Sequence, residues 1–391
     1  MPRGPVLDWS SFSPGAAPTL ASVGDLTHIT LVTSGRAAIY QALLALRLAP
    51  GSTVLVPSYH CPTMVAPVVV ARLNAAFFGI RADGLPDLDQ IDPACAQSAK
   101  AMIVAHYFGR SQSLAAVRRW CDQRGIALIE DCAHCFFGQA GERPIGAWGD
   151  FATASLTKFF PVPEGGLLAS NSRPVSGLEL TSQGLKAQLK GWLDVLELAT
   201  QNRRLAGLSH LLRPLFRLKN VRRAGPFAQS HRTTVALDTM LTDSDMARVG
   251  SAPLWATRVL SALPQSRIVA QRQQNHATYA QHFGAVQGAR PLFPASATAP
   301  APVAPYAFAL WVDDADRVYQ ALRDQHLPVF RWDRVWPGTP LVSGDQGPLW
   351  SQHVLQLLCH QNLSAADIEC TAQTILALLA TGAAAPSGAA P

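Results

Sequence analysis

The stretch HITLVTSGRAAIYQALLALRLAPG, residues 28–51, changes its hydrophobic pattern partway along. The first seven residues are mostly apolar or β-branched, which is typical of a short strand. From Gly35 onward the apolar side chains follow helical spacing, and the segment ends in Pro-Gly, which stops helices. A strand that runs directly into a helix is the unit from which helix-covered sheets are built.

The same alternation continues through residues 28–170. The predicted segments are a strand in STVLVPS (52–58), a helix in TMVAPVVVARLN (63–74), a strand in AKAMIVAHYFG (99–109), a helix in SLAAVRRWCDQRG (113–125) and a strand in IALIEDCAH (126–134). This order indicates a mainly parallel sheet covered on both faces. Ligands bind beyond the carboxyl ends of such strands. Three polar clusters fall there, at 33–36, 57–60 and 130–134.

The pattern changes after residue 250, which predicts a second, smaller α/β domain. Its segments are a long helical region (258–283), a Pro/Ala-rich loop (293–305), a strand (306–312), a helix (315–326), a short strand (327–333) and a closing helix (362–380) in which Ser364 and Asp367 resemble a capping box. The chain therefore divides into an N-terminal arm (1–27), a large domain (28–250) with a variable part (172–235), a small domain (251–380) and a tail (381–391) that we expect to be disordered.

Composition limits the class of protein. The chain has 391 residues, of which 48% are hydrophobic and 15% charged, so it can bury a large core and is not globally disordered. It has no apolar run long enough to span a bilayer and no apolar signal core at its start, so we expect a cytoplasmic protein. Its seven cysteines lack regular spacing and are predicted to be reduced thiols.

The net charge of +6 is concentrated in QNRRLAGLSHLLRPLFRLKNVRRAG, residues 201–225. A basic amphipathic stretch can lie on an anionic membrane surface or hold a phosphate-rich ligand. It can also be an ordinary solvated helix face, which we favour because Pro214 is expected to interrupt the helix. Nothing in the stretch has the motif of a nucleic-acid module.

A single lysine, Lys158, lies in the unusual stretch FATASLTKFFPVPEGG, residues 151–166. With Ser155 it forms Ser-x-x-Lys, the motif of penicillin-recognising enzymes, but the Ser-Asp-Asn and Lys-Thr-Gly partners of that motif are absent from the chain. A metal site in CAHC (132–135) would need further ligands, and no second cluster is present. The third interpretation is a Schiff-base lysine, whose shelter from water lowers its pKa and frees the amine to attack a carbonyl.

Pyridoxal phosphate (PLP) is such a carbonyl compound, and the sequence offers groups for each part of it. PLP needs an acid at its pyridine nitrogen and donors for its phosphate. Asp131 ends a predicted strand, and the turn of Ser34, Gly35 and Arg36 opens a helix whose amides could hold the phosphate. Thr153 and Ser155 add hydroxyl groups near the lysine.

Taken together, these pieces resemble the DegT/DnrJ/EryC1/StrS family of PLP-dependent sugar aminotransferases. The resemblance covers about residues 28–380 and rests on the order and spacing of TSGRAAIYQALLAL, GSTVLVPSYHCPTMV, AMIVAHYFG, IALIEDCAHCFFG, IGAWGDFATASLTKFFPVPEGGLLASN and LCHQNLSAADIE. It implies the fold-type I architecture: a mainly parallel seven-stranded sheet between helices, with a smaller C-terminal α/β domain. It also implies a homodimer with shared active sites.

The resemblance assigns roles by position. Lys158 matches the Schiff-base lysine, and Asp131 the acid at the pyridine nitrogen. His134 matches the Gln or His beside the phenolic oxygen of PLP. Phosphate contacts are assigned to Gly35, Arg36 and Thr153, and Glu164 matches the Glu of the Glu-Gly-Gly turn. Ser155, near the lysine, is a further candidate cofactor-binding residue.

Three differences from the family pattern concern the cofactor ring, the subunit interface and the substrate pocket. The ring-stacking aromatic position holds Cys61, so Tyr59 or His60 is a candidate instead. No clear counterpart exists for the Asn that reaches the neighbouring subunit's phosphate, for which Arg232 or His231 could substitute. Residues 172–235 match poorly, and there we assign Arg217, Arg222 and Arg232 as candidate acceptor-binding residues, together with Glu164 outside that range.

The function implied by the resemblance is transfer of an amino group, by analogy from glutamate, to a keto sugar linked to a nucleotide. Such a reaction would serve the synthesis of glycans, polysaccharides or antibiotic sugars. Two alternatives stay open: the same cofactor chemistry on a non-sugar acceptor, and a regulatory or binding homologue with reduced turnover. The retained Lys158 argues against the second, and the missing cross-subunit Asn argues weakly for it.

Overall fold

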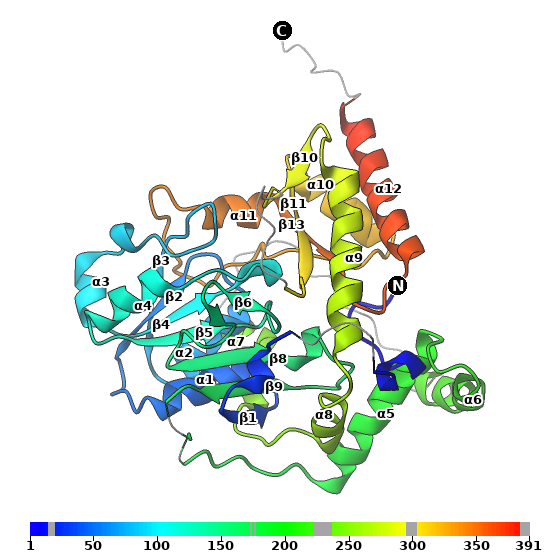
Figure 1. Ribbon diagram of the computed structural model, residues 1–391, viewed down its shortest axis with the longest axis horizontal. Helices are drawn as coiled ribbons and strands as arrows, with labels where there is room; N and C mark the ends of the chain where they lie inside the picture. Colours follow the sequence, from blue (N-terminus) through cyan, green and yellow to red (C-terminus); the bar gives the residue numbers. More distant parts are fainter. Residues whose placement is uncertain (15–19, 173, 176, 222–236, 295–302, 384–391) are drawn as a thin grey trace.

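The computed structural model describes residues 1–14, 20–172, 174–175, 177–221, 237–294 and 303–383. Its main sheet has seven strands in the order β1-β9-β8-β5-β4-β2-β3 (Figure 1). The strands are β1 (His28–Val32), β2 (Thr53–Pro57), β3 (Asn74–Phe78), β4 (Ala99–Ala105), β5 (Ala127–Asp131), β8 (Phe151–Ser155) and β9 (Gly166–Ser170). Only β9 runs against its neighbours, so the predicted mainly parallel sheet is confirmed.

Helices cover both faces of this sheet, as the alternating sequence predicts. In β2, Val54 and Val56 pack into the core beneath α1 (Gly35–Ala45) and α2 (Pro62–Val70), while Leu55 packs into the core on the other face with α4 (Ala115–Asp122). Successive side chains of a strand point to opposite faces, so a strand that is apolar at every position must be buried on both. The remaining elements of this part are α3 (Pro93–Ser98), the short pair β6 (Gln139–Ala140) and β7 (Arg143–Pro144), and α7 (Leu237–Asp243).

A second sheet of four antiparallel strands forms the smaller C-terminal unit, in the order β10-β11-β13-β12. Its elements are α9 (Ser266–Phe283), β10 (Ala289–Pro291), β11 (Ala307–Val312), α10 (Ala315–Asp324), β12 (Val329–Phe330), α11 (Gly347–His353), β13 (Val354–Leu358) and α12 (Ala365–Ala383). Strands β10 and β13 were not among the predicted segments. The helices and strands share one apolar core and lie above the main sheet in Figure 1.

Two predicted helix boundaries need correction, and one cap is present as expected. The predicted helical region 258–283 is two helices, α8 (Trp255–Leu260) and α9, because Pro264 lies between them and cannot donate a helical hydrogen bond. Helix α12 extends to residue 383, into the segment predicted to be a disordered tail. Ser364 and Asp367 exchange hydrogen bonds between side chain and backbone at 2.9 and 3.2 Å, which is a capping box.

The basic stretch forms a helix despite its proline. Helix α6 (Leu208–Val221) continues through Pro214, so the expected interruption is wrong. It packs beside α5 (Leu185–Gln201) at the edge of the molecule (Figure 1), with Phe216 only 5% exposed. Burial of Phe216 helps to offset the backbone hydrogen bond that proline removes.

The N-terminal arm is held by residues that precede α12. Pro2 O lies 3.1 Å from His360 Nε2, and Val6 N donates to Asn362 Oδ1 at 3.1 Å. Asn362 also donates to Asp8 at 2.7 Å. The seven cysteines are all free thiols, as predicted. Among the described helices, none combines the length and the apolar character that crossing a membrane requires.

Candidate active site

The carboxyl ends of five strands surround one cavity of about 320 Å³. The lining comes from the segments that follow β1, β2, β4, β5 and β8, from Asp245 and Arg248, which follow α7, and from Trp332 of the small unit. Because β1 runs parallel to β8, all five ends lie at the same edge of the sheet. The lining residues of most chemical interest are Ser34, Gly35, Arg36, Cys61, His106, Tyr107, Asp131, His134, Ser155, Thr157, Lys158, Glu164, Arg248 and Trp332.

Lys158 lies at the cavity wall with its amine sheltered from water. It ends the single turn η5 (Leu156–Lys158) that follows β8. Burial lowers the pKa of this amine from its ordinary value of 10.5 to about 8, although the nearby Asp131 carboxylate acts to raise it. Its Nζ lies 5.1 Å from the centre of the Tyr306 ring. Near pH 7 this lysine has an appreciable neutral fraction, which an exposed lysine lacks.

Asp131 is the last residue of β5 and is 7% exposed. Its Oδ1 accepts hydrogen bonds from Ala133 N at 2.9 Å and from Thr153 Oγ1 at 3.4 Å. Burial raises the pKa of this carboxyl, and the charge of Lys158 and the two hydrogen bonds oppose that effect. A carboxylate so placed can hold a proton-bearing group inside the cavity.

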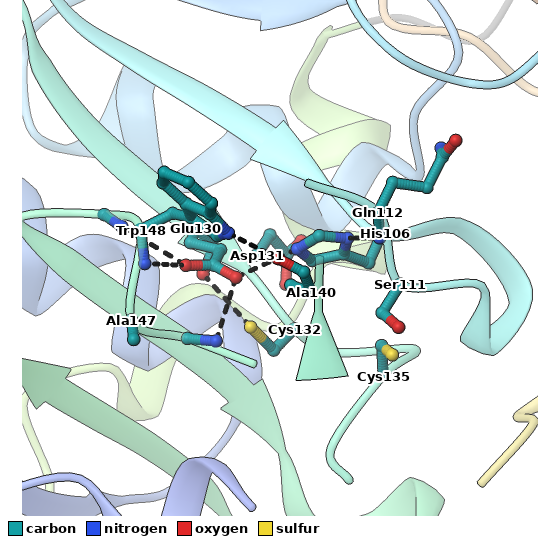
Figure 2. Close-up of polar contacts among 12 residues, drawn as sticks. His106, Ser111, Gln112, Glu130, Asp131, Cys132, Cys135, Ala140, Ala147 and Trp148 are labelled. Atoms are coloured by element: carbon teal, nitrogen blue, oxygen red, sulfur yellow. Dashed lines mark hydrogen bonds and ion pairs between the residues drawn. The ribbon is translucent and has the colours of Figure 1, made fainter. Parts of the chain in front are cut away.

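The neighbouring Glu130 points to the other side of the strand and anchors it (Figure 2). Its carboxylate accepts hydrogen bonds from three backbone N–H groups in the 146–149 turn, at 2.8, 2.8 and 3.2 Å. His106 Nε2 lies 2.9 Å from the same carboxylate, and Gln112 N donates to His106 Nδ1 at 3.4 Å. His106 Nδ1 therefore accepts, and Nε2 is the donor toward Glu130. This buried network fixes the end of β5 on which Asp131 sits.

The cysteines of the CAHC segment are part of the core. Cys132 Sγ lies 3.7 Å from Glu130 O, and Cys135 Sγ lies 3.7 Å from Gly109 O. Burial raises the pKa of both thiols, so they stay protonated and are poor metal ligands. The side chains of Cys132, His106 and Glu130 approach one another, but the Glu130 oxygens are already occupied by the donors of Figure 2.

His134 stacks on Tyr306 of the small unit, lies near the tilted ring of Trp332, and lines the cavity. Its ring lies 4.2 Å from that of Tyr306 and 4.8 Å from that of Trp332. Burial and the charge of Lys158 hold its pKa well below the usual range, so the ring is neutral. Its Nδ1 accepts from Phe108 N at 3.3 Å, which leaves the proton on Nε2. The free side of the ring is thus a hydrogen-bond donor.

The start of α1 and the turn after β8 form a polar part of the cavity wall. Ser34 caps α1 by accepting from Ala37 N at 3.2 Å. A Cβ added to Gly35 would lie 3.3 Å from Ser155 Cβ, so these two turns nearly touch. The guanidinium of Arg36 donates to Ser244 O and lies 4.0 Å from Asp245. Amides at a helix N-terminus beside an arginine and hydroxyl groups suit an anion such as phosphate.

Three predicted cofactor residues are not in the cavity lining, which corrects their expected positions. Tyr59 is fully buried and packs against Trp332 and Trp350. His60 Nε2 accepts from Trp336 N at 2.9 Å, and its ring stacks on Phe77. Their side chains fill the core between the two units. Of the three consecutive residues 59–61, only Cys61 lines the cavity.

Thr153 is the third of these residues. It is fully buried outside the cavity lining, and its hydroxyl donates to Asp131. The hydroxyl groups that do line the cavity on this side belong to Ser155 and Thr157, which lie 3.2 Å apart.

Glu164 lines the cavity, but protein groups occupy its carboxylate. It accepts from Leu254 N at 3.0 Å and from Gln183 Nε2 at 2.8 Å, and it pairs with Arg248. The glycines that follow it are required by packing: a Cβ on Gly166 would lie 2.1 Å from Ser34 O. The Glu-Gly-Gly turn thus joins β9 to the start of α1 and to the chain near residue 254.

The remaining predicted residues are in the basic stretch. Arg217 lies on α6, and no described residue of 201–221 lines the cavity. Arg222, His231 and Arg232 lie outside the described residues.

Several lining residues were not predicted. Thr157 lies in the same Ser-x-x-Lys stretch as Lys158 and could have been chosen for its hydroxyl. Trp332 and Arg248 come from segments far from the strand ends, and no local pattern marks them.

The chain is similar in sequence to known aminotransferases. The sequence model of the DegT/DnrJ/EryC1/StrS aminotransferase family matches residues 19–201. Over 174 residues the chain is 29% identical to the GDP-perosamine synthase of Vibrio cholerae, covering 43% of this chain and 47% of that protein. The chain thus aligns with about half the length of this curated relative.

Solved structures match over a larger part of the chain. The structure of DesI, solved in the presence of its TDP-sugar product, has a TM-score of 0.62 at 18% identity and covers 91% of this chain and 82% of that one. A candidate sugar aminotransferase from Streptococcus pneumoniae, in its PMP form, has a TM-score of 0.61 at 16% identity, with 91% and 88% covered. The fold is therefore that of these proteins, and residues 19–201 match the model of the DegT/DnrJ/EryC1/StrS aminotransferase family.

Proposed function

We propose that the protein is a PLP-dependent aminotransferase that transfers an amino group to a keto sugar carried on a nucleotide. The observation that carries this proposal is the meeting of Lys158, Asp131 and His134 at one cavity, where burial lowers the lysine pKa to about 8. A lysine amine at this pKa is available as a nucleophile near neutral pH.

The residues present suit PLP in each of its parts. We assign the pyridine nitrogen to Asp131, and the phenolic oxygen to the donor face of His134. The phosphate is assigned to the α1 N-terminus with Gly35, Arg36, Ser155 and Thr157. When bound, PLP supplies an aldehyde that takes up amines and a ring that accepts electrons.

The chain's own residues divide the remaining work. With the cofactor bound, Lys158 Nζ would serve as the nucleophile toward its aldehyde and as the general acid and base that moves a proton. Asp131 would keep a proton on the ring nitrogen, and Thr153 orients Asp131 through its hydrogen bond. Glu130 holds the strand that carries Asp131, and Glu164 holds the turn after the lysine.

The acceptor is proposed from the relatives. GDP-perosamine synthase is named for a nucleotide sugar, and DesI was solved with its TDP-sugar product. We infer a keto sugar on a nucleoside diphosphate as acceptor and glutamate as donor. A non-sugar acceptor would leave the donor half of the reaction intact, and a regulatory homologue would fail in both halves.

An absorbance spectrum tests the proposal. Protein purified with PLP should be yellow, and glutamate should shift the spectrum as the amino group is taken up. Borohydride should fix the cofactor on Lys158, as peptide mapping would show. Lys158→Ala should abolish both responses, whereas Lys186→Ala, an exposed lysine on α5, should preserve them. A label on another lysine would overturn the assignment.

We also propose a homodimer whose subunits complete each other's sites. His231 and Arg232 remain the candidate crossing residues. Mixing Lys158→Ala chains with Arg232→Ala chains should restore part of the activity, because some mixed sites would contain both intact residues. A monomer at micromolar concentration in a sedimentation experiment would contradict this proposal.

A further inference from the structure

Arg272, near the middle of α9, is a fully buried cation. Burial lowers the pKa of its guanidinium to about 10, so it remains charged at neutral pH. Among the described residues, the ionisable groups that raise this pKa are the thiol of Cys359 and the phenol of Tyr306, and neither is a carboxylate. Desolvating a guanidinium without a carboxylate is costly, so other contacts must hold it there.

The guanidinium donates to oxygens from three separate segments. Its Nη2 donates to Lys158 O at 2.5 Å, its Nη1 to Pro305 O at 3.0 Å, and its Nε to Gln361 Oε1 at 3.0 Å. Its flat face lies over the ring of Phe159, with 4.5 Å between Cζ and the ring centre. A planar cation with donors in fixed directions can join three segments in this way, and a lysine cannot.

Gln361 holds the carbonyl of Phe159, the residue after Lys158. Its Nε2 donates to Phe159 O at 2.7 Å, while its Oε1 accepts from Arg272. The two consecutive carbonyls of Lys158 and Phe159 are therefore both held from the small unit. With its backbone fixed on the carboxyl side, the Lys158 side chain has few directions open to it.

Arg272 also acts on the segment that carries Tyr306, because its Nη1 donates to Pro305 O. Pro305 precedes Tyr306, whose ring lies 5.1 Å from Lys158 Nζ and 4.2 Å from the His134 ring. One side chain thus fixes both the backbone that carries the amine and the segment that carries the aromatic ring beside it.

We infer that Arg272, acting with Gln361, is a positioning residue that holds the Lys158 amine toward the cavity and against Tyr306. The inference rests on the proposed role of Lys158. Arg272 touches neither the cavity nor any reacting atom among the described contacts, so its effect passes through the Lys158 backbone and the 305–306 segment.

The test compares Arg272→Met and Gln361→Met with a control on the same helix. Methionine keeps the volume and removes the donors. Arg267→Met is the control, because Arg267 is 37% exposed and makes its ion pair with Asp8, away from the lysine. Circular dichroism and thermal unfolding would first establish which variants are folded. Gln361→Met keeps the inference testable should Arg272→Met fail to fold.

The first measurement needs no cofactor. Acetic anhydride labelling of Lys158 across pH, followed by mass spectrometry, gives the apparent pKa of this amine. A loosened amine reaches more water, so its burial no longer disfavours the charged form to the same extent. The apparent pKa should therefore rise from about 8 toward 10.5, by roughly half a unit or more in Arg272→Met. Arg267→Met should match the wild type.

The second measurement is turnover with PLP bound. Misplacing the amine should lower kcat by about tenfold or more and leave the KM of the amino donor within about twofold. Arg272→Lys should recover part of the loss, since its single amine can reach only some of these oxygens. The kcat of the double variant Arg272→Met/Gln361→Met should be little lower than that of Arg272→Met alone, because the two side chains act as one unit.

The outcomes separate this inference from the proposed function. A folded Arg272→Met protein with unchanged Lys158 pKa and kcat within twofold would overturn the positioning role. Full turnover by Lys158→Ala would instead overturn the proposed function, while the labelling result would still report on Arg272.

Discussion

At the scale of single residues, the reactivity of Lys158 is a balance between two opposing effects. Burial disfavours the charged amine, and the Asp131 carboxylate favours it. Burial is the larger effect, so the pKa falls to about 8. The same burial keeps His134 neutral, which preserves its Nε2 donor.

The first prediction concerns the pH dependence of cofactor capture by Lys158. Only the neutral amine attacks an aldehyde, and its fraction rises as pH approaches the pKa from below. The second-order rate constant for PLP should increase about tenfold per pH unit below pH 8 and level off above it. Stopped-flow absorbance measures this rate. A plateau reached only near pH 10.5, as for a free lysine, would refute the prediction.

The second prediction concerns Asp131. Asp131→Asn keeps the shape and the acceptor for Ala133 N but removes the charge that holds a proton on the pyridine nitrogen. We expect weaker PLP binding and a loss of kcat of about 10² or more. Equilibrium binding and steady-state kinetics check both effects. Wild-type turnover in the variant would show that Asp131 does not serve the cofactor.

At the scale of elements, β5 carries two acids with different tasks. Asp131 faces the cavity, and Glu130 faces the core, where three backbone N–H groups and His106 donate to it (Figure 2). The alternation of side chains along a strand separates the two. Glu130 holds the end of β5 in place, and Asp131 is thereby positioned at the cavity.

The third prediction is that Glu130→Gln destabilises the fold. A glutamine turns an N–H₂ group toward donors that need an acceptor, and charge-assisted hydrogen bonds are lost. We expect a fall in the free energy of unfolding of about 2–4 kcal/mol, measured by urea denaturation at pH 7. Glu142→Gln, at an exposed position, should change it by less than about 0.5 kcal/mol. A loss for Glu130→Gln no larger than for this control would contradict the anchoring role.

At the scale of the whole molecule, the charge is unevenly distributed. Residues 198–237 contain eight Lys and Arg and no Asp or Glu, while the rest of the chain has 24 basic and 26 acidic residues. Helix α6, which carries part of this charge, packs on α5 at the edge of the molecule (Figure 1). Its position favours a solvated face over a role at the cavity of the same chain.

The fourth prediction follows from that position. Reversing Arg217 and Arg222 to Glu should leave the acceptor KM within about twofold and leave binding to vesicles of anionic lipid unchanged. A raised acceptor KM with an intact glutamate half-reaction would instead place the stretch at a partner subunit's substrate. Release from anionic but not neutral vesicles would identify a membrane-surface helix.

The sequence by itself determined the layered α/β fold and the core of the candidate site. Strand and helix periodicities are local, and parallel strands end at one edge, so Asp131, His134, Lys158 and the 34–36 turn could be expected to meet. Only the tertiary structure decided which side chains complete the cavity. Trp332 lines the cavity, Tyr306 lies beside the Lys158 amine, and Arg272 holds the Lys158 carbonyl, all from more than 100 residues away in sequence, and no local pattern encodes that approach.

The positions of Tyr59, His60 and Thr153 have the same explanation. Each lies close in sequence to a strand end, yet long-range partners draw it into the core: Trp350 for Tyr59, Trp336 for His60, and Asp131 for Thr153. Local sequence specifies where a strand ends because periodicity acts within a few residues. The direction of a side chain beyond that end depends on which distant segment packs against it, and packing is decided only when the whole chain folds.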